Sequence, residues 1–419
     1  MAQFRFIHCS DLHIDSPFKG LTSQNPALSS VLRESTFKAF QNIARLALQE
    51  KVDAVLIAGD VFDGADRSLQ AQLKFRRILK ELSDQKIKIF IAHGNHDPLD
   101  SWSRTLEWPE HVTIFPGNKV QRVPVQKEGK NIAWIYGISF PQKKVTENLA
   151  LKFRKDEEEG FSVGVLHANV GQQPGHDNYA PCSINDLVSR NFDYWALGHI
   201  HEHKVLRESA PAIVYSGSTQ ARHLGEKGQK GCCLVTLSSN GPPEIRFMVT
   251  DVVSYCSSTV NMANAENIND VIREIQVKCE KLTKEAILRE GLVAHLTLTG
   301  RTPIYKELQA SGVLNALSEE IYAFFEGHSP WVMIELSNQT AGNYDINNLK
   351  EGKDFIADLV NLCDETDKEA LQNKVRDGLK PVFETWAGRK YLDELSKEEI
   401  DELIQKSRDL ALDQLVDNS

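Results

Sequence analysis

The sequence predicts an α/β protein in which a two-layered β-sandwich flanked by helices is followed by a small α+β domain and a helical carboxyl-terminal region. Three observations support this prediction. Apolar runs rich in β-branched and aromatic residues alternate with amphipathic helical patterns through the first hundred residues. Shorter strand-like runs then follow one another to about residue 250. Beyond about residue 350 the pattern is helical and heavily charged.

The first third of the chain reads as strand, helix, strand, helix, strand. The expected strands span residues 4–9, 53–58 and 87–91, and the expected helices span 29–51 and 68–85. One face of the first helix collects apolar side chains, as a helix packed on a sheet requires. Units of this kind form right-handed crossovers around a buried parallel sheet.

The middle of the chain is rich in short strands. They are expected over residues 112–115, 120–125, 132–138, 162–166, 194–197, 212–215, 231–237 and 244–250. A polar helix is expected over 145–159, where the acidic run 156–159 reads as a solvated face. Together with the first third, these strands complete the two layers of the sandwich.

The last part of the chain divides into three segments after the first domain, which spans 1–250. The small α+β domain spans 251–337, with strands over 254–260, 292–299 and 331–336 and helices over 268–290 and 305–325, the second of which Gly312 is positioned to break. The Asn-rich segment 338–350 reads as a linker, and 351–419 as a helical region.

Composition limits the class of protein. A hydrophobic fraction of 41% and a charged fraction of 25% are typical of a globular domain. A net charge of −10 argues against a surface made wholly for nucleic acid but is compatible with a local basic groove. No apolar run reaches the roughly 20 residues of a membrane span. Seven cysteines without CxxC spacing, and no signal-peptide pattern, favour reduced thiols in a cytoplasmic protein.

Polar side chains follow the apolar strands at the points where the strands end. The clearest case is Gly94-Asn95-His96-Asp97, which offers an amide oxygen, an imidazole and a carboxylate directly after the strand at 87–91. In open α/β sheets such loops gather at the carboxyl edge, where ligands bind. The full set of strand-end side chains is Asp11, His13, Asp60, Asn95, His167, His199 and His201. With His96, these positions hold five of the thirteen histidines, which scatter would not produce.

The residue types in this set indicate a metal site. Oxygen and imidazole donors without cysteine favour manganese, iron or zinc in octahedral-leaning geometry over a structural zinc site. Asp60 has two carboxylate oxygens and can bridge two ions about 3.5–4 Å apart, which is the geometry of two-metal phosphoester chemistry.

In chain order, Asp11-x-His13, Gly59-Asp60, Gly94-Asn95-His96-Asp97, His167 and Gly198-His199-x-His201 resemble the signature of the calcineurin-like metallophosphoesterases. Five separated elements in register make this resemblance specific. Within the superfamily the chain is similar to the DNA-repair exonuclease branch, which includes the SbcD-like nucleases, and most of all to the YhaO-like proteins. The runs 6–18, 59–63 and 174–181 carry the similarity to this branch, and 291–308 is similar to its capping region.

The resemblance implies a metallophosphoesterase fold with a nuclease domain at 1–250, a cap at 251–337 and two divalent metal ions, with Mn²⁺ expected and Fe²⁺ or Zn²⁺ as alternatives. The first ion would bind Asp11, His13, Asp60 and His201, and the second Asp60, Asn95, His167 and His199. His96 would contact the scissile phosphate or protonate the leaving oxygen. Asp63 stands where some relatives carry a histidine, so its part in catalysis stays open.

Three further residues are considered for supporting roles. Asp97 either orients His96 or a ligand imidazole, or is a surface aspartate, and both interpretations stay open. Arg222 and His176 lie on loops and are candidates for contact with a substrate phosphate.

The implied function is a two-metal-dependent phosphodiesterase that hydrolyses DNA, an exonuclease or endonuclease of DNA repair. A metallophosphoesterase acting on nucleotides, lipids or phosphoproteins is the alternative, and a non-catalytic scaffold is the third hypothesis. The expected partners are DNA, an SbcC-like ATPase of the SMC type and, in a homodimer, a second copy of the chain. No membrane is expected.

The helical tail is the segment expected to bind the ATPase. Ser396 and Glu399 form a capping-box pattern that opens its last helix. An apolar stripe then follows at helical spacing, made of Ile400, Leu403, Ile404, Leu410, Ala411 and Leu415. The stripe either folds back on the cap or lies on a helix of another protein.

Overall fold

The computed structural model describes residues 3–16, 26–64, 68–101, 106–172, 177–226, 228–285, 289–365, 368–385 and 395–415. The chain forms two compact units. The first unit comprises Met1–Cys256, Ala286–Val293 and Ser329–Trp331, and the second comprises Ser257–Glu285, Ala294–His328 and Val332–Ser419.

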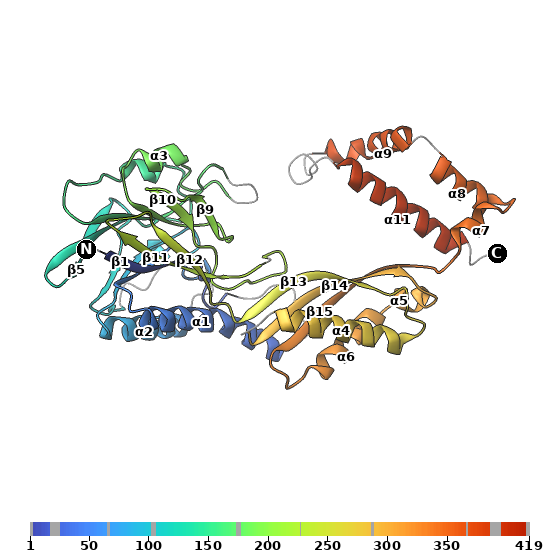
Figure 1. Ribbon diagram of the computed structural model, residues 1–419, viewed down its shortest axis with the longest axis horizontal. Helices are drawn as coiled ribbons and strands as arrows, with labels where there is room; N and C mark the ends of the chain where they lie inside the picture. Colours follow the sequence, from blue (N-terminus) through green and yellow to red (C-terminus); the bar gives the residue numbers. More distant parts are fainter. Residues whose placement is uncertain are drawn as a thin grey trace. The chain divides into compact units, whose positions relative to one another are not determined.

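The first sheet of the first unit has the strand order β12-β11-β1-β2-β3-β4. Its strands are β1 (Gln3–Cys9), β2 (Ala54–Ala58), β3 (Lys88–Ala92), β4 (Val112–Ile114), β11 (Gly231–Ser238) and β12 (Glu244–Val249). Strands β1 to β4 are parallel to one another, and β11 is antiparallel to both of its neighbours, β1 and β12. Helices α1 (Pro26–Gln49) and α2 (Leu69–Asp84) pack on its outer face (Figure 1). The predicted order of strands and helices is therefore confirmed.

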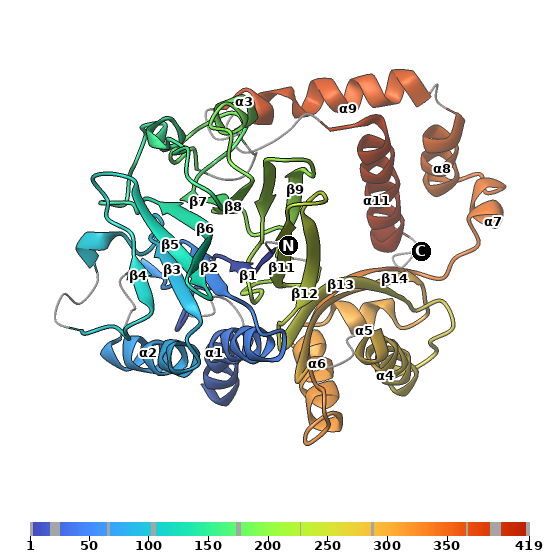
Figure 2. The same cartoon turned by 60° about the vertical axis from the view of Figure 1, so that its left-hand side comes forward.

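The second sheet faces the first and has the order β5-β6-β7-β8-β10-β9. Its strands are β5 (Gln121–Lys127), β6 (Lys130–Gly137), β7 (Phe161–His167), β8 (Tyr194–Gly198), β9 (Lys204–Arg207) and β10 (Ala212–Tyr215), and Figure 2 shows how the two sheets are layered. Apolar side chains of both sheets, among them Phe6, Leu56 and Val163, form one buried layer between them. The short helices η3 (Leu149–Lys152) and α3 (Ile184–Val188) cover the opposite face. The predicted two-layered sandwich flanked by helices is confirmed.

The polar helix predicted over 145–159 is wrong. Only the single turn η3 is helical there, and residues 153–159 are irregular. Arg122 holds the acidic stretch by binding Asp156 and Glu158 at 2.6 and 2.9 Å. Trp134 donates from Nε1 to the Glu159 carbonyl at 3.0 Å. These contacts from distant strands outweigh a local preference for helix.

The second unit contains a sheet of three parallel strands, each preceded or followed by a helix. The strands are β13 (Val253–Asn261), β14 (Gly291–Arg301) and β15 (Trp331–Ala341), whose first residues belong to the first unit. The helices are α4 (Ile268–Glu285), α5 (Tyr305–Gln309) and α6 (Val313–Phe324), and all three lie on one side of the sheet in Figures 1 and 2. Gly312, at φ +85°, separates α5 from α6 as predicted.

The segment 338–350, predicted as a linker, is mostly ordered secondary structure. It contains the end of β15 and helix α7 (Ile346–Lys350), so that only 342–345 is irregular. The side chain of Asp345 accepts hydrogen bonds from the backbone of Asn347 and Asn348 at 2.9 and 3.3 Å. One polar side chain of this segment, that of Asp345, therefore caps a helix.

The tail is made of α8 (Phe355–Glu365), α9 (Lys368–Phe383) and α11 (Lys397–Leu415). The predicted capping box is confirmed, because Ser396 N donates to Glu399 at 2.7 Å and Glu399 N donates to Ser396 Oγ at 3.2 Å. Within the described residues, no helix has both the length and the apolarity needed to cross a bilayer.

The apolar stripe predicted on helix α11 is buried in one part and exposed in another. Leu412 is buried against α8, and Ile400 is buried as well. Asp409 of α11 pairs with Arg301 at the end of β14, in the same unit, at 2.7 Å. Helix α11 therefore folds back on its own unit through the side that carries Asp409. Leu403 and Leu410 remain 37% and 59% exposed.

His8 of β1 links the two sheets of the first unit. Its Nδ1 lies 3.1 Å from Tyr194 Oη, and its Nε2 lies 3.1 Å from the Leu197 carbonyl. Complete burial, only partly offset by the hydrogen bond to Leu197, lowers the pKa of His8 from 6.5 to about 3. The ring is therefore neutral in the folded protein.

We expect His8 to make the fold sensitive to mild acid. Between pH 6.5 and about 3 the unfolded chain binds a proton at His8 that the folded chain does not bind. The free energy of unfolding therefore falls as pH falls through this window, by up to about 1.4 kcal/mol per pH unit. Urea titrations at pH 7, 6, 5 and 4 give the free energy of unfolding at each pH. This free energy should fall less steeply with falling pH in His8→Gln than in the wild type, and the variant His328→Gln, at an exposed histidine, is the control. Equal slopes would contradict the role given to His8.

Candidate metal centre

The seven strand-end side chains predicted as ligands come together at the carboxyl ends of strands from both sheets. Asp11 and His13 follow β1, Asp60 follows β2 and Asn95 follows β3. His167 ends β7, while His199 and His201 follow β8. Strands far apart in the sequence thus deliver the set because parallel neighbours end at the same edge.

One group is formed by Asp11, His13 and His201. Nε2 of His13 lies 3.3 Å from Nε2 of His201, and the latter lies 3.8 Å from Asp11 Oδ1. A second group is formed by Asp60, Asn95 and His167, whose Nε2 lies 3.0 Å from Asn95 Oδ1.

Asp60 stands between the two groups. Its Oδ2 lies 3.5 Å from His167 Nε2 on one side and 4.0 Å from His13 Nε2 on the other. The other oxygen, Oδ1, accepts a hydrogen bond from the backbone of His96 at 2.9 Å, which fixes the carboxylate. One buried carboxylate oxygen therefore faces an imidazole of each group.

Hydrogen bonds to the second ring nitrogen set the tautomers of three histidines. His167 donates from Nδ1 to the Ala58 carbonyl at 2.9 Å, which leaves the lone pair on Nε2. His199 donates from Nε2 to the Asp177 carbonyl at 2.8 Å, which leaves the lone pair on Nδ1. His201 donates from Nδ1 to Glu226 at 2.8 Å, so that its Nε2 lone pair faces His13 and Asp11. Each ring is thereby prepared as a ligand.

The backbone turns sharply at the ligand positions. Asp11, His13, Asp60 and His199 have φ angles of +50°, +43°, +52° and +102°, a region that residues other than glycine rarely adopt. Backbone hydrogen bonds hold these turns, for example from His13 N to the Asp60 carbonyl at 3.0 Å. Gly94 permits the close approach, because a Cβ there would lie 2.2 Å from Asp60 Oδ1.

The residues present fit two divalent cations. The carboxylates of Asp11 and Asp60 are buried, with exposures of 0% and 2%, and such charges require compensation. Asp11 and Asp60 each belong to a set of His and Asp atoms that lie within 4.8 Å of one another. His13 Nδ1 is buried and has no hydrogen-bond partner among the described residues. Nitrogen and oxygen donors without thiolate suit Mn²⁺, Fe²⁺ or Zn²⁺.

His96 lies beside the ligand groups and is the more open imidazole, with 38% of its side chain exposed. Its Nδ1 lies 2.6 Å from Asp63 Oδ1. Burial opposes the charged form, but the hydrogen bond to Asp63 and the charges of Asp60 and Asp63 outweigh it and raise the pKa of His96. Asp63 is itself held at Oδ2 by Ser16 and Arg222, at 2.7 and 3.0 Å.

The other predicted supporting residues differ in their burial and in their contacts. Asp97 is fully buried, so the surface-aspartate interpretation is wrong. Instead of orienting an imidazole of the site, its two oxygens accept from Gly94 N and Val61 N, both at 2.9 Å, which ties two ligand loops together. Arg222 is 14% exposed and is bound by carboxylates. His176 lies outside the described residues.

Glu226 is a site residue that sequence reasoning missed. It is buried, and its carboxylate contacts both His201 and Arg222. Burial acts to raise the pKa of Glu226, but the hydrogen bond and charge of His201, with the charges of Arg222 and Lys230, lower it to about 2. The only local signal was its four-residue spacing from Arg222 on a loop that follows a strand.

Comparisons with known proteins show what this chain is similar to. The family described as calcineurin-like phosphoesterase matches residues 4–203. An uncharacterized metallophosphoesterase of Bacillus subtilis, YhaO, is 33% identical over 411 residues, which are 97% of each chain. The DNA double-strand break repair protein Mre11 of Methanocaldococcus jannaschii is 25% identical over 283 residues, 65% of this chain and 73% of that protein. A dimetal phosphatase structure from Danio rerio covers 59% of this chain and 97% of its own, at 12% identity and a TM-score of 0.38.

We expect Asp60→Asn to lose most of the bound metal. The asparagine keeps the size of the side chain but removes the negative charge that lies between the two ligand groups. Metal content after gel filtration in Mn²⁺, measured by mass spectrometry of the element, should fall for Asp60→Asn and stay unchanged for Asp84→Asn on the exposed side of α2. Two ions retained by Asp60→Asn would contradict the position assigned to this carboxylate.

Proposed function

This chain belongs to the calcineurin-like phosphoesterase family, and we propose that within it the protein is a two-metal-dependent phosphodiesterase that hydrolyses DNA, as an exonuclease or endonuclease of DNA repair. The site itself is that of a metal-dependent phosphoesterase. The observation that carries the choice of DNA is the similarity to Mre11, whose 283 aligned residues exceed the region of the family match.

The arrangement suits a phosphodiester. When bound, two divalent ions supply positive charge against the phosphate and Lewis acidity that activates water. Asp11 and Asp60 provide the buried negative charge that holds cations there. We propose Mn²⁺ as these ions, with Fe²⁺ and Zn²⁺ as alternatives that the same donors accept.

His96 is the residue proposed to act on the leaving group. Its Nδ1 is bound to Asp63 at 2.6 Å, so Nε2 is the ring nitrogen available to a substrate. The raised pKa of His96 keeps a larger fraction of the ring protonated near neutral pH. A proton donated from Nε2 to the departing sugar oxygen removes the need to expel an alkoxide.

The two other hypotheses are less well supported. A non-catalytic scaffold would not need seven ligand side chains, two tautomer-setting carbonyls and strained backbone at four positions. A phosphoesterase acting on nucleotides, lipids or phosphoproteins could use the same core. The similarity to Mre11 favours DNA over these substrates.

The direct test uses purified protein with Mn²⁺ on single-stranded DNA, double-stranded DNA, a cyclic nucleotide and a phosphopeptide. We expect DNA cleavage to be the fastest reaction. His96→Ala should lower turnover by about 10²–10⁴-fold, the usual contribution of one general acid, while the metal content stays the same. His328→Ala, an exposed histidine, is the control. Preferred hydrolysis of the cyclic nucleotide or the phosphopeptide would refute the DNA assignment.

We further propose that an SbcC-like ATPase of the SMC type binds the tail. The support is the exposed part of the α11 stripe, where Leu403 and Leu410 have a spacing of seven residues, as in a coiled-coil seam. The sequence has no GxxxxGK[ST] phosphate-binding loop, so ATP-driven handling of DNA would come from another chain.

A double variant tests this proposal more sharply than truncation after Gly378, which would cut through α9. Leu403→Glu with Leu410→Glu should abolish co-purification with the SbcC-like ATPase of the same organism. Cleavage of single-stranded DNA should be preserved, because both leucines lie outside the metal centre. An unchanged complex would contradict the proposal. If instead the wild type alone forms a homodimer that the double variant disrupts, the face serves a second copy of the chain.

A further inference from the structure

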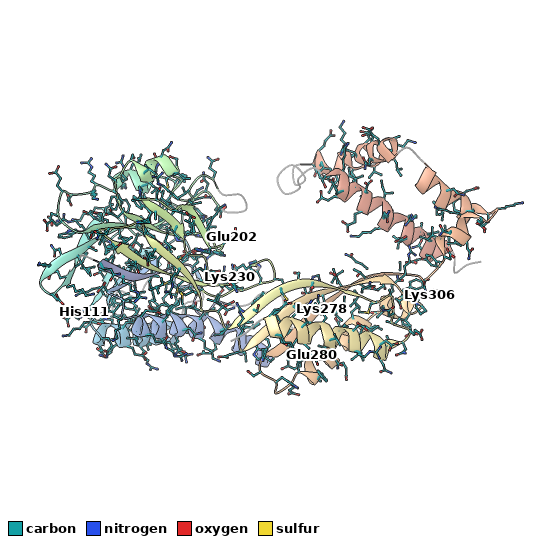
Figure 3. All side chains as sticks on the ribbon, in the orientation of Figure 1. His111, Glu202, Lys230, Lys278, Glu280 and Lys306 are labelled. Atoms are coloured by element: carbon teal, nitrogen blue, oxygen red, sulfur yellow. The ribbon has the colours of Figure 1, made fainter. Side chains whose placement is uncertain are left out.

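The loop 216–230, between β10 and β11, wraps around His201. The carbonyl of His201 accepts hydrogen bonds from Ser218 N at 3.1 Å and from Lys230 Nζ at 2.8 Å. Gly217, at φ +77°, allows the loop to approach, because a Cβ there would lie 2.7 Å from His203 N. The backbone of this ligand is thus fixed from both ends of one loop. Lys230 is labelled in Figure 3.

The same loop also holds the side chain of His201 through Glu226. Oε1 of Glu226 accepts from His201 Nδ1 at 2.8 Å, and Oε2 accepts from Arg222 N at 3.0 Å. Both carboxylate oxygens are therefore occupied, and the Glu226 side chain is only 6% exposed. The arrangement points Nε2 of His201 toward His13 Nε2, 3.3 Å away.

Arg222 connects the carboxylate of Glu226 to that of Asp63. Its Nη2 lies 3.5 Å from Glu226 Oε1, and its Nη1 lies 3.0 Å from Asp63 Oδ2. The guanidinium balances the charge of two buried or half-buried carboxylates. An alanine at 226 would leave both Arg222 and the His201 N–H without this partner.

We propose that Glu226 is a positioning residue for the metal subsite made by Asp11, His13 and His201. By accepting from Nδ1 it sets the tautomer and the ring orientation of His201, and its negative charge makes Nε2 a stronger ligand. It acts on this subsite alone, because none of its contacts reaches Asn95 or His167 among the described residues. The inference rests on the proposed metal-dependent function but not on the choice of DNA as substrate.

Selective loss of one metal distinguishes this role from a general structural one. Apoprotein is titrated with Mn²⁺, and free Mn²⁺ is followed by electron paramagnetic resonance. The wild type should bind two ions. Glu226→Ala should bind one ion as the wild type does and the other about 10–100-fold more weakly, the usual effect of removing such a carboxylate. Glu226→Gln, which keeps an acceptor for Nδ1, should lose less.

Glu202→Gln is the matched control, because Glu202 neighbours His201 in the sequence, is exposed and carries the same charge (Figure 3). It should bind Mn²⁺ as the wild type does. Saturating Mn²⁺ should restore the DNA cleavage of Glu226→Ala to within a few-fold of the wild type, since His96 and the second group are intact. The activity of His96→Ala should not recover in this way.

Two results would overturn the inference. One is unchanged affinity at both subsites in Glu226→Ala. The other is equal weakening of both subsites together with a lower melting temperature of the apoprotein, which indicates only structural damage. If the wild type binds two Mn²⁺ but cleaves no DNA, the proposed substrate is wrong, while selective loss in Glu226→Ala still supports the positioning role.

Discussion

The buried carboxylate of Asp60 is the constraint on which the rest of the first unit depends. One of its oxygens faces His167 and His13 at 3.5 and 4.0 Å, so it belongs to both ligand groups. A second buried carboxylate, Asp11, lies in the same centre. Negative charges removed from water are tolerated when cations or several donors compensate them. The fold must therefore bring loops from two separate sheets to one point and hold them there.

The local structure at the strand ends meets this requirement at the expense of backbone strain. Four ligand residues have positive φ, and backbone hydrogen bonds between neighbouring loops keep them in that conformation. Asp97 contributes by joining the backbones of Gly94 and Val61. The strain and the buried aspartates make sense as parts of a site that is organised before metal or substrate binds.

Much of this centre could be predicted from the sequence because the ligands obey a local rule. Each follows an apolar strand, and parallel strands end at a common edge, so Asp60 and Asn95 could be placed together without knowing any contact. Glu226 could not be found in this way, since its meeting with His201 depends on how a long loop folds. The same holds for Asp97, whose burial comes from tertiary packing, and for 145–159, where Arg122 on a distant strand outweighs helical pattern. The linker prediction was wrong for 346–350 because short polar residues, here Asp345, are common both in loops and at helix starts.

We expect one carboxylate, Asp60, to be shared by two metal ions. X-ray anomalous scattering at the manganese edge, from crystals of the wild-type protein grown with Mn²⁺, would locate the ions relative to Asp60. We expect two peaks about 3.5–4 Å apart, with the Asp60 carboxylate between them, Asp11, His13 and His201 on one side and Asn95, His167 and His199 on the other. A single peak, or two peaks of which only one contacts Asp60, would contradict it.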